Sequence, residues 1–281
     1  MERQAAFELD TKGLPKQFLG KDTGTLALVV MPFLGGSWKE WEEVIGAFSP
    51  RVRCIGIDLP GFGDAAEVEG YSVAQMAEYV VARLRTLKLK RFLLVGHSMA
   101  GKVSLVVARL AKNDPELSGL AGLVLVASSP PSPEPMSDDK RAEMRANLGR
   151  PGNSYRKHAE KFIQENTAQT LPSHIFAHAV SDVLRMNCAA WNAWLDSGSK
   201  EDWSERVGEL DLPALVIAGE VDPALGFEAQ AKLVMPHLSN AQLKVLTGAA
   251  HLLPMERPQE LAQLIADFAD RIVPDFERRG Q

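Results

Sequence analysis

Ser98 lies where a serine could act as a nucleophile. The apolar run Leu93-Leu94-Val95 before it has the continuous pattern of a strand buried on both faces, and Gly96 ends that run. Small and apolar residues at helical spacing follow from position 99 to position 110. A serine at such a strand-to-helix turn has an exposed hydroxyl and lies at the positive end of the helix dipole. The pattern therefore predicts a nucleophilic serine at position 98.

The motif Gly96-His97-Ser98-Met99-Ala100-Gly101 departs at one position from the Gly-x-Ser-x-Gly pattern of such turns. Alanine stands where the second glycine is usual, and a glycine follows one residue later. A small residue is needed there because the helix packs closely, and alanine is the least disruptive departure. Taken alone, the stretch also fits an ordinary strand, loop and helix, so the remaining catalytic groups must come from elsewhere.

Asp222 and His251 could supply the groups that a serine nucleophile needs. A serine hydroxyl requires a base, a group that orients the base, and donors for the developing oxyanion. Asp222 follows an apolar segment that ends at Ala218, and His251 follows the last predicted strand. Both positions are carboxyl ends of strands, where parallel sheets carry their sites. Ser, Asp, His is also the chain order of one triad-bearing fold.

The elements that would position these residues alternate between strands and helices. Ser72 is expected to cap one helix, and two others should follow Ser98 and begin at Pro258. This alternation predicts an α/β fold with a mostly parallel, doubly wound sheet. Short edge strands are further candidates at 7–9 and 17–19. The main strands are predicted at 26–31, 52–57, 92–95, 120–127, 212–219 and 242–246.

The strand pattern is interrupted between about residues 128 and 210. A proline-rich stretch at 129–135 indicates a rigid linker, and helical patterns follow it. These helices are expected at 137–148, 155–168 and 174–194, with Ser181 as a candidate break in the last one. We therefore predict a helical cap at 131–207, inserted into a core formed by 1–130 and 208–281.

As a set, these segments resemble the α/β-hydrolase family, a large group of esterases and related enzymes. The resemblance covers about residues 26–127 and 210–272, and the agreement of several segments in order and spacing makes it specific. It implies an α/β-hydrolase core with a helical cap and a serine hydrolase. Besides the motif around Ser98, the matching segments are DLPGFG at 58–63, LPALVIAGEVD at 212–222, and His251 with ERP at 256–258.

Position by position, the resemblance implies that Ser98 is the nucleophile, His251 the general base and then acid, and Asp222 the carboxylate that orients the histidine. It also implies that the Met99 backbone N–H is one oxyanion donor. His97 adjoins the nucleophile, but a neighbour on a sharp turn points elsewhere. Glu220 is nearer the strand end than Asp222 and remains an alternative, although the family pattern favours Asp222.

The second oxyanion donor should come from the loop after the first strong strand. Many relatives carry His-Gly there before the donor residue, whereas this chain has Met31-Pro32 followed by Phe33. Proline has no N–H, so we expect the Phe33 amide to donate, with Leu34 as the second choice. We expect the absence of the histidine to change the contacts that support this loop without abolishing the oxyanion hole.

The substrate is expected to bind between the core and the cap. Candidate substrate contacts are Leu34, Trp38, His178 and Trp194. Low charge and an apolar cap favour a small to medium, mostly apolar carboxylic ester. The same fold also supports carbon–carbon bond, lactone or amide hydrolysis, lyase chemistry, or a receptor that retains its triad. Serine at position 98 argues against a dehalogenase, whose family uses aspartate there.

Composition argues against several other classes. A net charge of -5 over 281 residues, with no basic stripe, makes nucleic acid an unexpected partner. The apolar run at 26–36 is too short to span a bilayer and the N-terminus lacks a signal pattern, so we predict a cytoplasmic monomer or homodimer. Cys54 and Cys188 fit no metal or disulfide pattern, and no metal or cofactor is expected. Gly35-Gly36 lacks the lysine of a phosphate loop.

Overall fold

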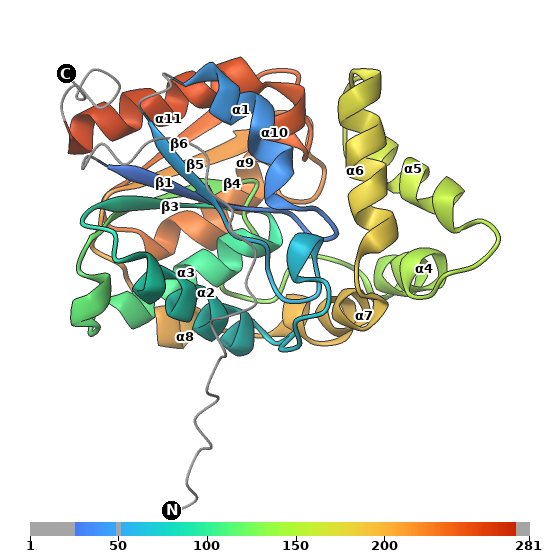
Figure 1. Cartoon of the computed structure of the whole chain (residues 1–281), viewed down its shortest axis with the longest axis horizontal. Helices are drawn as coiled ribbons and strands as arrows, with labels where there is room; N and C mark the ends of the chain where they lie inside the picture. Colours follow the sequence, from blue (N-terminus) through green and yellow to red (C-terminus); the bar gives the residue numbers. More distant parts are fainter. Residues whose placement is uncertain (1–25, 49–51, 274–281) are drawn as a thin grey trace, which may run out of the picture.

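The computed structural model describes residues 26–48 and 52–273 (Figure 1). Its centre is one six-stranded sheet in the order β2-β1-β3-β4-β5-β6, with every neighbouring pair parallel. The predicted parallel sheet is confirmed, whereas the candidate strands at 7–9 and 17–19 lie outside the described residues. The strands are β1 (Ala27–Met31), β2 (Arg53–Gly56), β3 (Phe92–His97), β4 (Leu120–Val126), β5 (Ala214–Gly219) and β6 (Ala241–Leu246).

Burial of the strands explains their sequences. β3 and β5 are buried along their whole length, in keeping with their continuous apolar runs. β6 lies at the edge of the sheet, and apolar and polar residues alternate along most of its sequence. Most of its residues are partly or fully exposed. Central strands of this kind hold the loops at their carboxyl ends in fixed positions.

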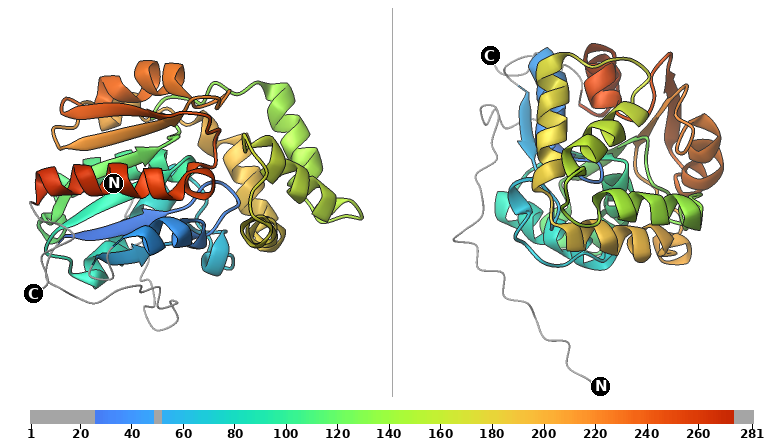
Figure 2. Two further views of the ribbon diagram at one scale, coloured as in Figure 1. Left: turned by 90° about the horizontal axis from the view of Figure 1, so that it is seen from above. Right: turned by 90° about the vertical axis from the view of Figure 1, so that its right-hand side faces the viewer.

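Helices cover both faces of the sheet, as predicted (Figure 2). α2 (Val73–Leu87) and α3 (Met99–Ala111) bury their apolar sides in one core cluster with strand residues such as Leu94. α1 (Glu42–Ala47) and α11 (Pro258–Ile272) pack on the other face. The two faces receive alternate strand residues, because successive side chains of a strand point in opposite directions.

Ser72 caps α2 as its sequence predicts. The Ser72 hydroxyl accepts from the Gln75 backbone N–H, and the Gln75 side chain accepts from the Ser72 backbone N–H. This reciprocal capping satisfies two backbone donors that no preceding turn of helix can satisfy. The first turn of α2 is thereby stabilised.

Four cap helices lie together at one end of the molecule, beside the carboxyl ends of the strands (Figures 1 and 2). They all come from the segment between β4 and β5. The two short linking helices are a 3-10 turn at Gly198–Lys200 and α8 (Ser204–Val207), and α8 packs against α3 of the core. The cap helices are α4 (Asp138–Leu148), α5 (Tyr155–Glu165), α6 (Ser173–Arg185) and α7 (Cys188–Asp196).

The break in the predicted helix 174–194 is displaced from its expected place. Ser181 lies inside α6, and the chain leaves the helix only at Met186, whose backbone is extended. Asn187 then starts α7, because its side-chain oxygen accepts from the Ala189 backbone N–H. An asparagine cap thus decides the break, and the prediction of Ser181 was wrong.

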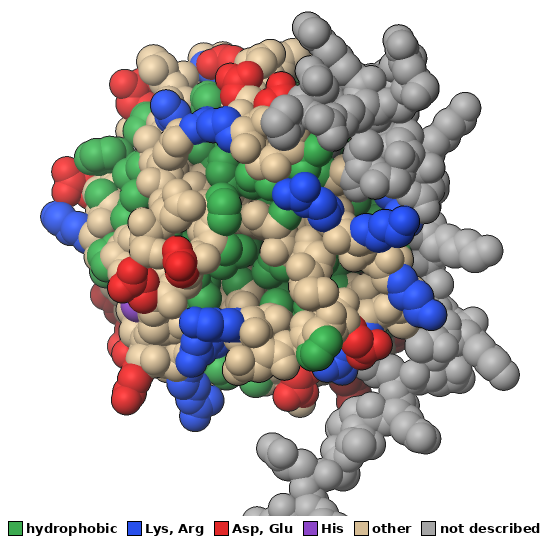
Figure 3. All heavy atoms as spheres, turned by 90° about the vertical axis from the view of Figure 1, so that its left-hand side faces the viewer, with side chains coloured by type: hydrophobic (Ala, Val, Ile, Leu, Met, Phe, Trp, Pro, Cys, Tyr) green, Lys and Arg blue, Asp and Glu red, His purple; other side chains and the backbone are tan. Residues whose placement is uncertain are grey.

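The surface opposite the cap carries charges of both signs. Where described residues form the face in Figure 3, lysine and arginine side chains are scattered among aspartate and glutamate side chains. None of the helices within 26–48 and 52–273 combines the length and the apolar character that crossing a membrane requires.

Candidate active site

The Ser98 turn is a strained strand-to-helix corner. Ser98 follows the last residue of β3 and precedes the first residue of α3, with φ 54° and ψ −118°. This left-handed φ is costly for a residue other than glycine, so the surroundings must hold it. The Ser98 carbonyl accepts from Gly101 N at 2.8 Å and Ser129 N at 3.0 Å, and its own N–H donates to Val126 at 2.9 Å.

At this corner, the position that has no room for a side chain is Gly101 rather than Ala100. A Cβ atom at Gly101 would lie 2.1 Å from Ser128 Oγ and 3.0 Å from Ser128 Cα. Ala100 is fully buried and fits with its methyl group. The alanine in the motif therefore does not disturb the turn, because the glycine that the packing needs stands one residue later.

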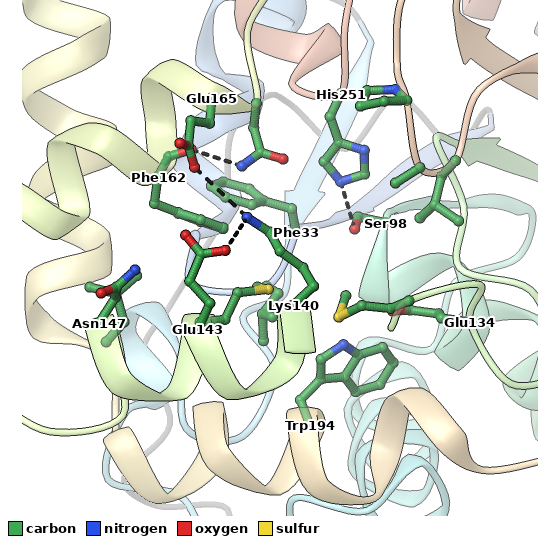
Figure 4. Close-up of a pocket in the computed structure, with 18 of the residues that line it drawn as sticks. Phe33, Ser98, Glu134, Lys140, Glu143, Asn147, Phe162, Glu165, Trp194 and His251 are labelled. Carbon is green, nitrogen blue, oxygen red and sulfur yellow. Dashed lines mark hydrogen bonds and ion pairs between the residues drawn. The ribbon is translucent and has the colours of Figure 1, made fainter. Parts of the chain in front are cut away.

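The structure brings the three predicted side chains together. Ser98 Oγ lies 2.9 Å from His251 Nε2 (Figure 4), and His251 Nδ1 lies 2.7 Å from Asp222 Oδ2. Asp222 stands in the loop after β5 and His251 in the loop after β6. The other carboxylate oxygen of Asp222 accepts from the backbone N–H groups of Ala224 and Leu225 at 2.9 and 3.1 Å.

These contacts set the charges and the tautomer of the site. Burial opposes the charge of Asp222, but His251 and two backbone donors lower the pKa of Asp222 to about 2. Burial likewise opposes a charged His251, yet the charge and hydrogen bond of Asp222 raise the pKa of His251 above its usual value. A carboxylate only accepts, so Nδ1 carries the proton and Nε2 can accept the Ser98 proton.

The alternative acid and base lie elsewhere. Glu220 Oε2 accepts from the Gly248 backbone N–H at 2.8 Å, which fixes the loop before His251 without touching the imidazole. His97 is fully buried, and its Nε2 lies 2.8 Å from the backbone oxygen of His251. Within the described chain, Glu220 is not bonded to the His251 ring and His97 is not bonded to Ser98 Oγ, so the geometry favours Asp222 and His251.

A buried Glu40–His97 pair is a feature that sequence reasoning missed. His97 Nδ1 lies 2.9 Å from Glu40 Oε1, and neither side chain reaches solvent. Because the His251 carbonyl can only accept, His97 Nε2 carries its proton. Burial raises the pKa of Glu40 well above its usual value, while burial and the nearby His251 lower the pKa of His97 to about 3. A protonated Glu40 that donates to neutral His97 satisfies all of these contacts.

The loop after β1 is held from several sides. Its turn at Gly35 has φ +89°, which favours glycine. Ser37 Oγ donates to Asp182 of α6 at 2.6 Å, and Trp38 N donates to Asp58 at 2.6 Å. Burial raises the pKa of Asp58 to about 6, although hydrogen bonds from two backbone N–H groups act to lower it. These hydrogen bonds connect the loop to the segment after β2, which contains Asp58, and to the cap helix α6, which contains Asp182.

Phe33 and Leu34 of this loop border the same cavity as Ser98. Met99 is the first residue of α3, where a backbone N–H has no acceptor in a preceding helical turn.

A cavity of about 540 Å³ lies between the Ser98 corner and the cap helices α4, α5 and α7. Its outer end carries two lysines and two glutamates from α4 and α5, which are ion-paired with one another at 3.0 to 4.0 Å. Most of its wall is apolar. Its larger apolar lining residues are Phe33, Leu34, Met136, Met144, Leu148, Phe162, Trp194 and Leu225.

Two of the four predicted substrate contacts lie on this cavity. Leu34 and Trp194 line it. Trp38 instead packs its ring against Gly56, where an added Cβ would meet the ring at 2.3 Å. His178 lies in a separate small cleft, 3.7 Å from Asp182. The predictions for Trp38 and His178 are corrected, because a one-turn helix and a half-exposed cap helix direct these side chains away from Ser98.

No metal site is formed by the residues that the structure describes, since no group of three or more His, Cys, Asp or Glu side chains could hold an ion there. Cys54 and Cys188 are free thiols. Burial raises the pKa of the Cys54 thiol to about 12, which makes it inert.

Comparisons with known proteins agree with this architecture. The model of the alpha/beta hydrolase family matches residues 28–264. A pimeloyl-[acyl-carrier protein] methyl ester esterase of Yersinia enterocolitica is 26% identical over 262 residues, covering 88% of this chain and 95% of the relative.

Solved structures share the fold. An esterase from Thermogutta terrifontis has a TM-score of 0.75 and 23% identity, covering 92% of this chain and 93% of its own. A bromoperoxidase from Bacillus anthracis has a TM-score of 0.78 and 19% identity, covering 90% and 93%.

Proposed function

Because this chain belongs to the alpha/beta hydrolase family, we propose that it hydrolyses carboxylic esters through an acyl-enzyme on Ser98. The single observation that carries the proposal is the continuous contact from Ser98 Oγ through His251 to Asp222, at 2.9 and 2.7 Å. An activated serine in a mostly apolar cavity matches the needs of acyl transfer.

In the first half of the reaction, His251 Nε2 takes the Ser98 proton while Oγ attacks the ester carbonyl. The tetrahedral intermediate collapses, the ester C–O bond breaks, and His251 returns the proton to the leaving alcohol. A water molecule then gives its proton to His251 and attacks the acyl carbon. The acid leaves as the proton passes back to Ser98, and the enzyme is restored. Asp222 stabilises the imidazolium in both halves.

The oxyanion of each intermediate is assigned to two backbone donors. The Met99 N–H is one, because it lies at the start of α3 where the helix dipole also favours negative charge. The second comes from the Phe33–Leu34 segment. The Phe33 N–H is the first choice and the Leu34 N–H the second, since both residues border the cavity beside Ser98 and Pro32 before them has no N–H.

The cavity supports an ester with a mostly apolar body of small to medium size. Its volume of about 540 Å³ and its wall of aromatic and aliphatic side chains suit such a substrate. The Yersinia relative is named a methyl ester esterase, which agrees with this reaction class.

The proposal is tested with p-nitrophenyl esters of short acids. Wild-type protein should release p-nitrophenol, and Ser98→Ala should reduce turnover to background while the circular dichroism spectrum stays unchanged. Ser118→Ala changes an exposed serine far from the cavity and is the matched control. Unchanged turnover in Ser98→Ala, or strong cleavage of a vinylogous diketone with weak ester cleavage, would contradict the proposal.

A further inference from the structure

Glu134 places a carboxyl group on the wall of the cavity that contains Ser98 (Figure 4). Glu134 is only 9% exposed, and it belongs to the proline-rich linker that leads into the cap. Its neighbours on the cavity wall include Trp194. Burying a carboxyl group costs free energy unless the group has hydrogen-bonding or charged partners. A buried glutamate beside a nucleophile is therefore expected to have a role.

The backbone of Glu134 is fixed. Its N–H donates to the Ser199 carbonyl at 2.8 Å, and its carbonyl accepts from Met136 N at 2.7 Å and from Arg141 Nη2 at 3.4 Å. Prolines stand on both sides, at 133 and 135. The side chain is thus presented to the cavity from a rigid segment, as a binding group needs to be.

One oxygen of Glu134 is satisfied and the other is not. Oε1 accepts from the Ser129 hydroxyl, and the Ser129 backbone N–H donates to the Ser98 carbonyl at 3.0 Å. A single residue therefore connects the carboxyl to the nucleophile turn. Oε2 is not fully buried, and it receives no hydrogen bond or ion pair from residues 26–48 or 52–273, so it remains free to accept from a molecule in the cavity.

The other two glutamates on the cavity differ from Glu134. Glu143 and Glu165 lie at the outer end, half exposed, and both are ion-paired with Lys140 and Lys161. Within the described residues, no lysine or arginine side chain lies within ion-pair distance of the Glu134 carboxyl. Of the three, only Glu134 has a carboxylate oxygen that no described residue contacts as a hydrogen-bond or ion-pair partner.

The charge of Glu134 is nevertheless offset from a distance. Lys102 and Arg141 are both buried, and their cationic groups are already bonded to carbonyl oxygens, Lys102 Nζ to that of Glu201 at 2.9 Å. Burial raises the pKa of Glu134, while the Ser129 hydrogen bond and the charges of Lys102, His251 and Arg141 act against it. These cations offset only part of the cost of burial, and a neutral hydroxyl would give Oε2 a hydrogen bond without bringing a further charge into the mostly apolar cavity.

We propose that Glu134 Oε2 accepts a hydrogen bond from a hydroxyl group of the substrate, placed a few bonds from the scissile ester. The inference rests on the proposed ester hydrolysis and adds a substrate class to it: esters with a hydroxyl near the ester group, on an otherwise apolar body. A site built to hydrogen-bond a substrate hydroxyl discriminates against the hydrocarbon analogue, because its acceptor is then left unpaired.

The test compares esters that differ only in this group. On the acyl side, methyl 3-hydroxybutanoate is paired with methyl 3-methylbutanoate; on the alcohol side, 2-hydroxyethyl butanoate is paired with propyl butanoate. Methyl 3-aminobutanoate tests a cationic donor. The wild-type enzyme should prefer the hydroxy ester of at least one pair by about tenfold or more in kcat/KM, the size expected of one hydrogen bond to a carboxylate.

Variants assign any preference to Glu134. Glu134→Leu should bring the hydroxy-to-hydrocarbon ratio close to one. Glu134→Gln can keep the Ser129 contact through its amide oxygen but then presents an NH2 donor in place of Oε2, so the preference for the hydroxy ester should be smaller; this variant covers the case in which the leucine variant does not fold. Glu143→Gln alters a cavity glutamate that is already ion-paired, and the ratio should persist.

The outcomes separate this inference from the function it rests on. Hydrolysis of both members of each pair at equal rates would overturn the hydroxyl site and leave ester hydrolysis standing. A preference that survives in Glu134→Leu, or a preference for the amino ester over the hydroxy ester, would also overturn it. Failure of the wild type to cleave any of these esters or p-nitrophenyl esters would instead count against ester hydrolysis itself.

Discussion

His97 Nδ1 lies 2.9 Å from Glu40 Oε1, and His97 Nε2 lies 2.8 Å from the backbone oxygen of His251. This buried chain joins the one-turn helix after the β1 loop to the loop that carries the proposed base. The Glu40–His97 pair therefore anchors the loop that begins at Pro32 and carries the proposed oxyanion donor.

Glu40→Ala should therefore lower kcat by about tenfold to a hundredfold with a smaller change in KM, because displacing catalytic groups by about 1 Å can cost that much. Glu40→Gln should remain within a few-fold of wild type, since the amide can donate to His97 Nδ1 as a protonated carboxyl does. Steady-state kinetics on a p-nitrophenyl ester measure both. A large loss in Glu40→Gln would show that the pair is ionised and that this assignment is wrong.

Asp222 and Glu220 are distinguished by a pair of isosteric amides. Asp222→Asn should reduce kcat by about 10³-fold to 10⁴-fold, because the amide cannot hold His251 in the required tautomer. Glu220→Gln removes only part of a contact to the Gly248 backbone and should change kcat by a few-fold at most. The reverse order of effects would assign the orienting role to Glu220.

The pH dependence follows from the raised pKa of His251. The base acts only when neutral, so kcat/KM should rise with pH through a pKa above the usual value of about 6.5 and then level off. The charge of Glu134 contributes to that rise, so Glu134→Gln should move the acidic limb to lower pH. A limb that stays in place, or moves to higher pH, would contradict this electrostatic coupling.

Packing at the nucleophile corner predicts a difference in stability. Gly101→Ala should lower the free energy of unfolding by about 1 to 3 kcal/mol, because its Cβ would overlap Ser128. Ala100→Gly should cost only about 1 kcal/mol, the usual helix penalty of glycine. Urea unfolding of both variants checks the order. Equal losses would mean that the close approach at position 101 is relieved by a small shift of Ser128.

The sheet and the three residues now proposed as a triad could be predicted from the sequence, and the reason is the same for both. Ser98, Asp222 and His251 each follow a buried strand, and a parallel sheet brings carboxyl ends of strands to one edge. These relations are local in sequence, so they could be recognised without knowing any long-range contact.

Other features depend on contacts between distant segments and were beyond the sequence. Glu40 stands between two tryptophans in a single helical turn, where a glutamate would ordinarily face solvent. Trp38 occupies the space over Gly56 rather than the cavity. The unpaired Oε2 of Glu134 could be recognised only from the structure, in which the linker lies beside the Ser98 corner and Ser129 contacts Oε1.

The central claim is that Ser98 is the activated nucleophile, and covalent labelling tests it most directly. The folded protein is incubated with a fluorophosphonate, digested, and the modified peptide is located by mass spectrometry. We predict one adduct on Ser98 in the wild type, none in Ser98→Ala, and much slower labelling in His251→Ala. A folded wild-type protein that takes up no label, or takes it up on another residue, would contradict the account.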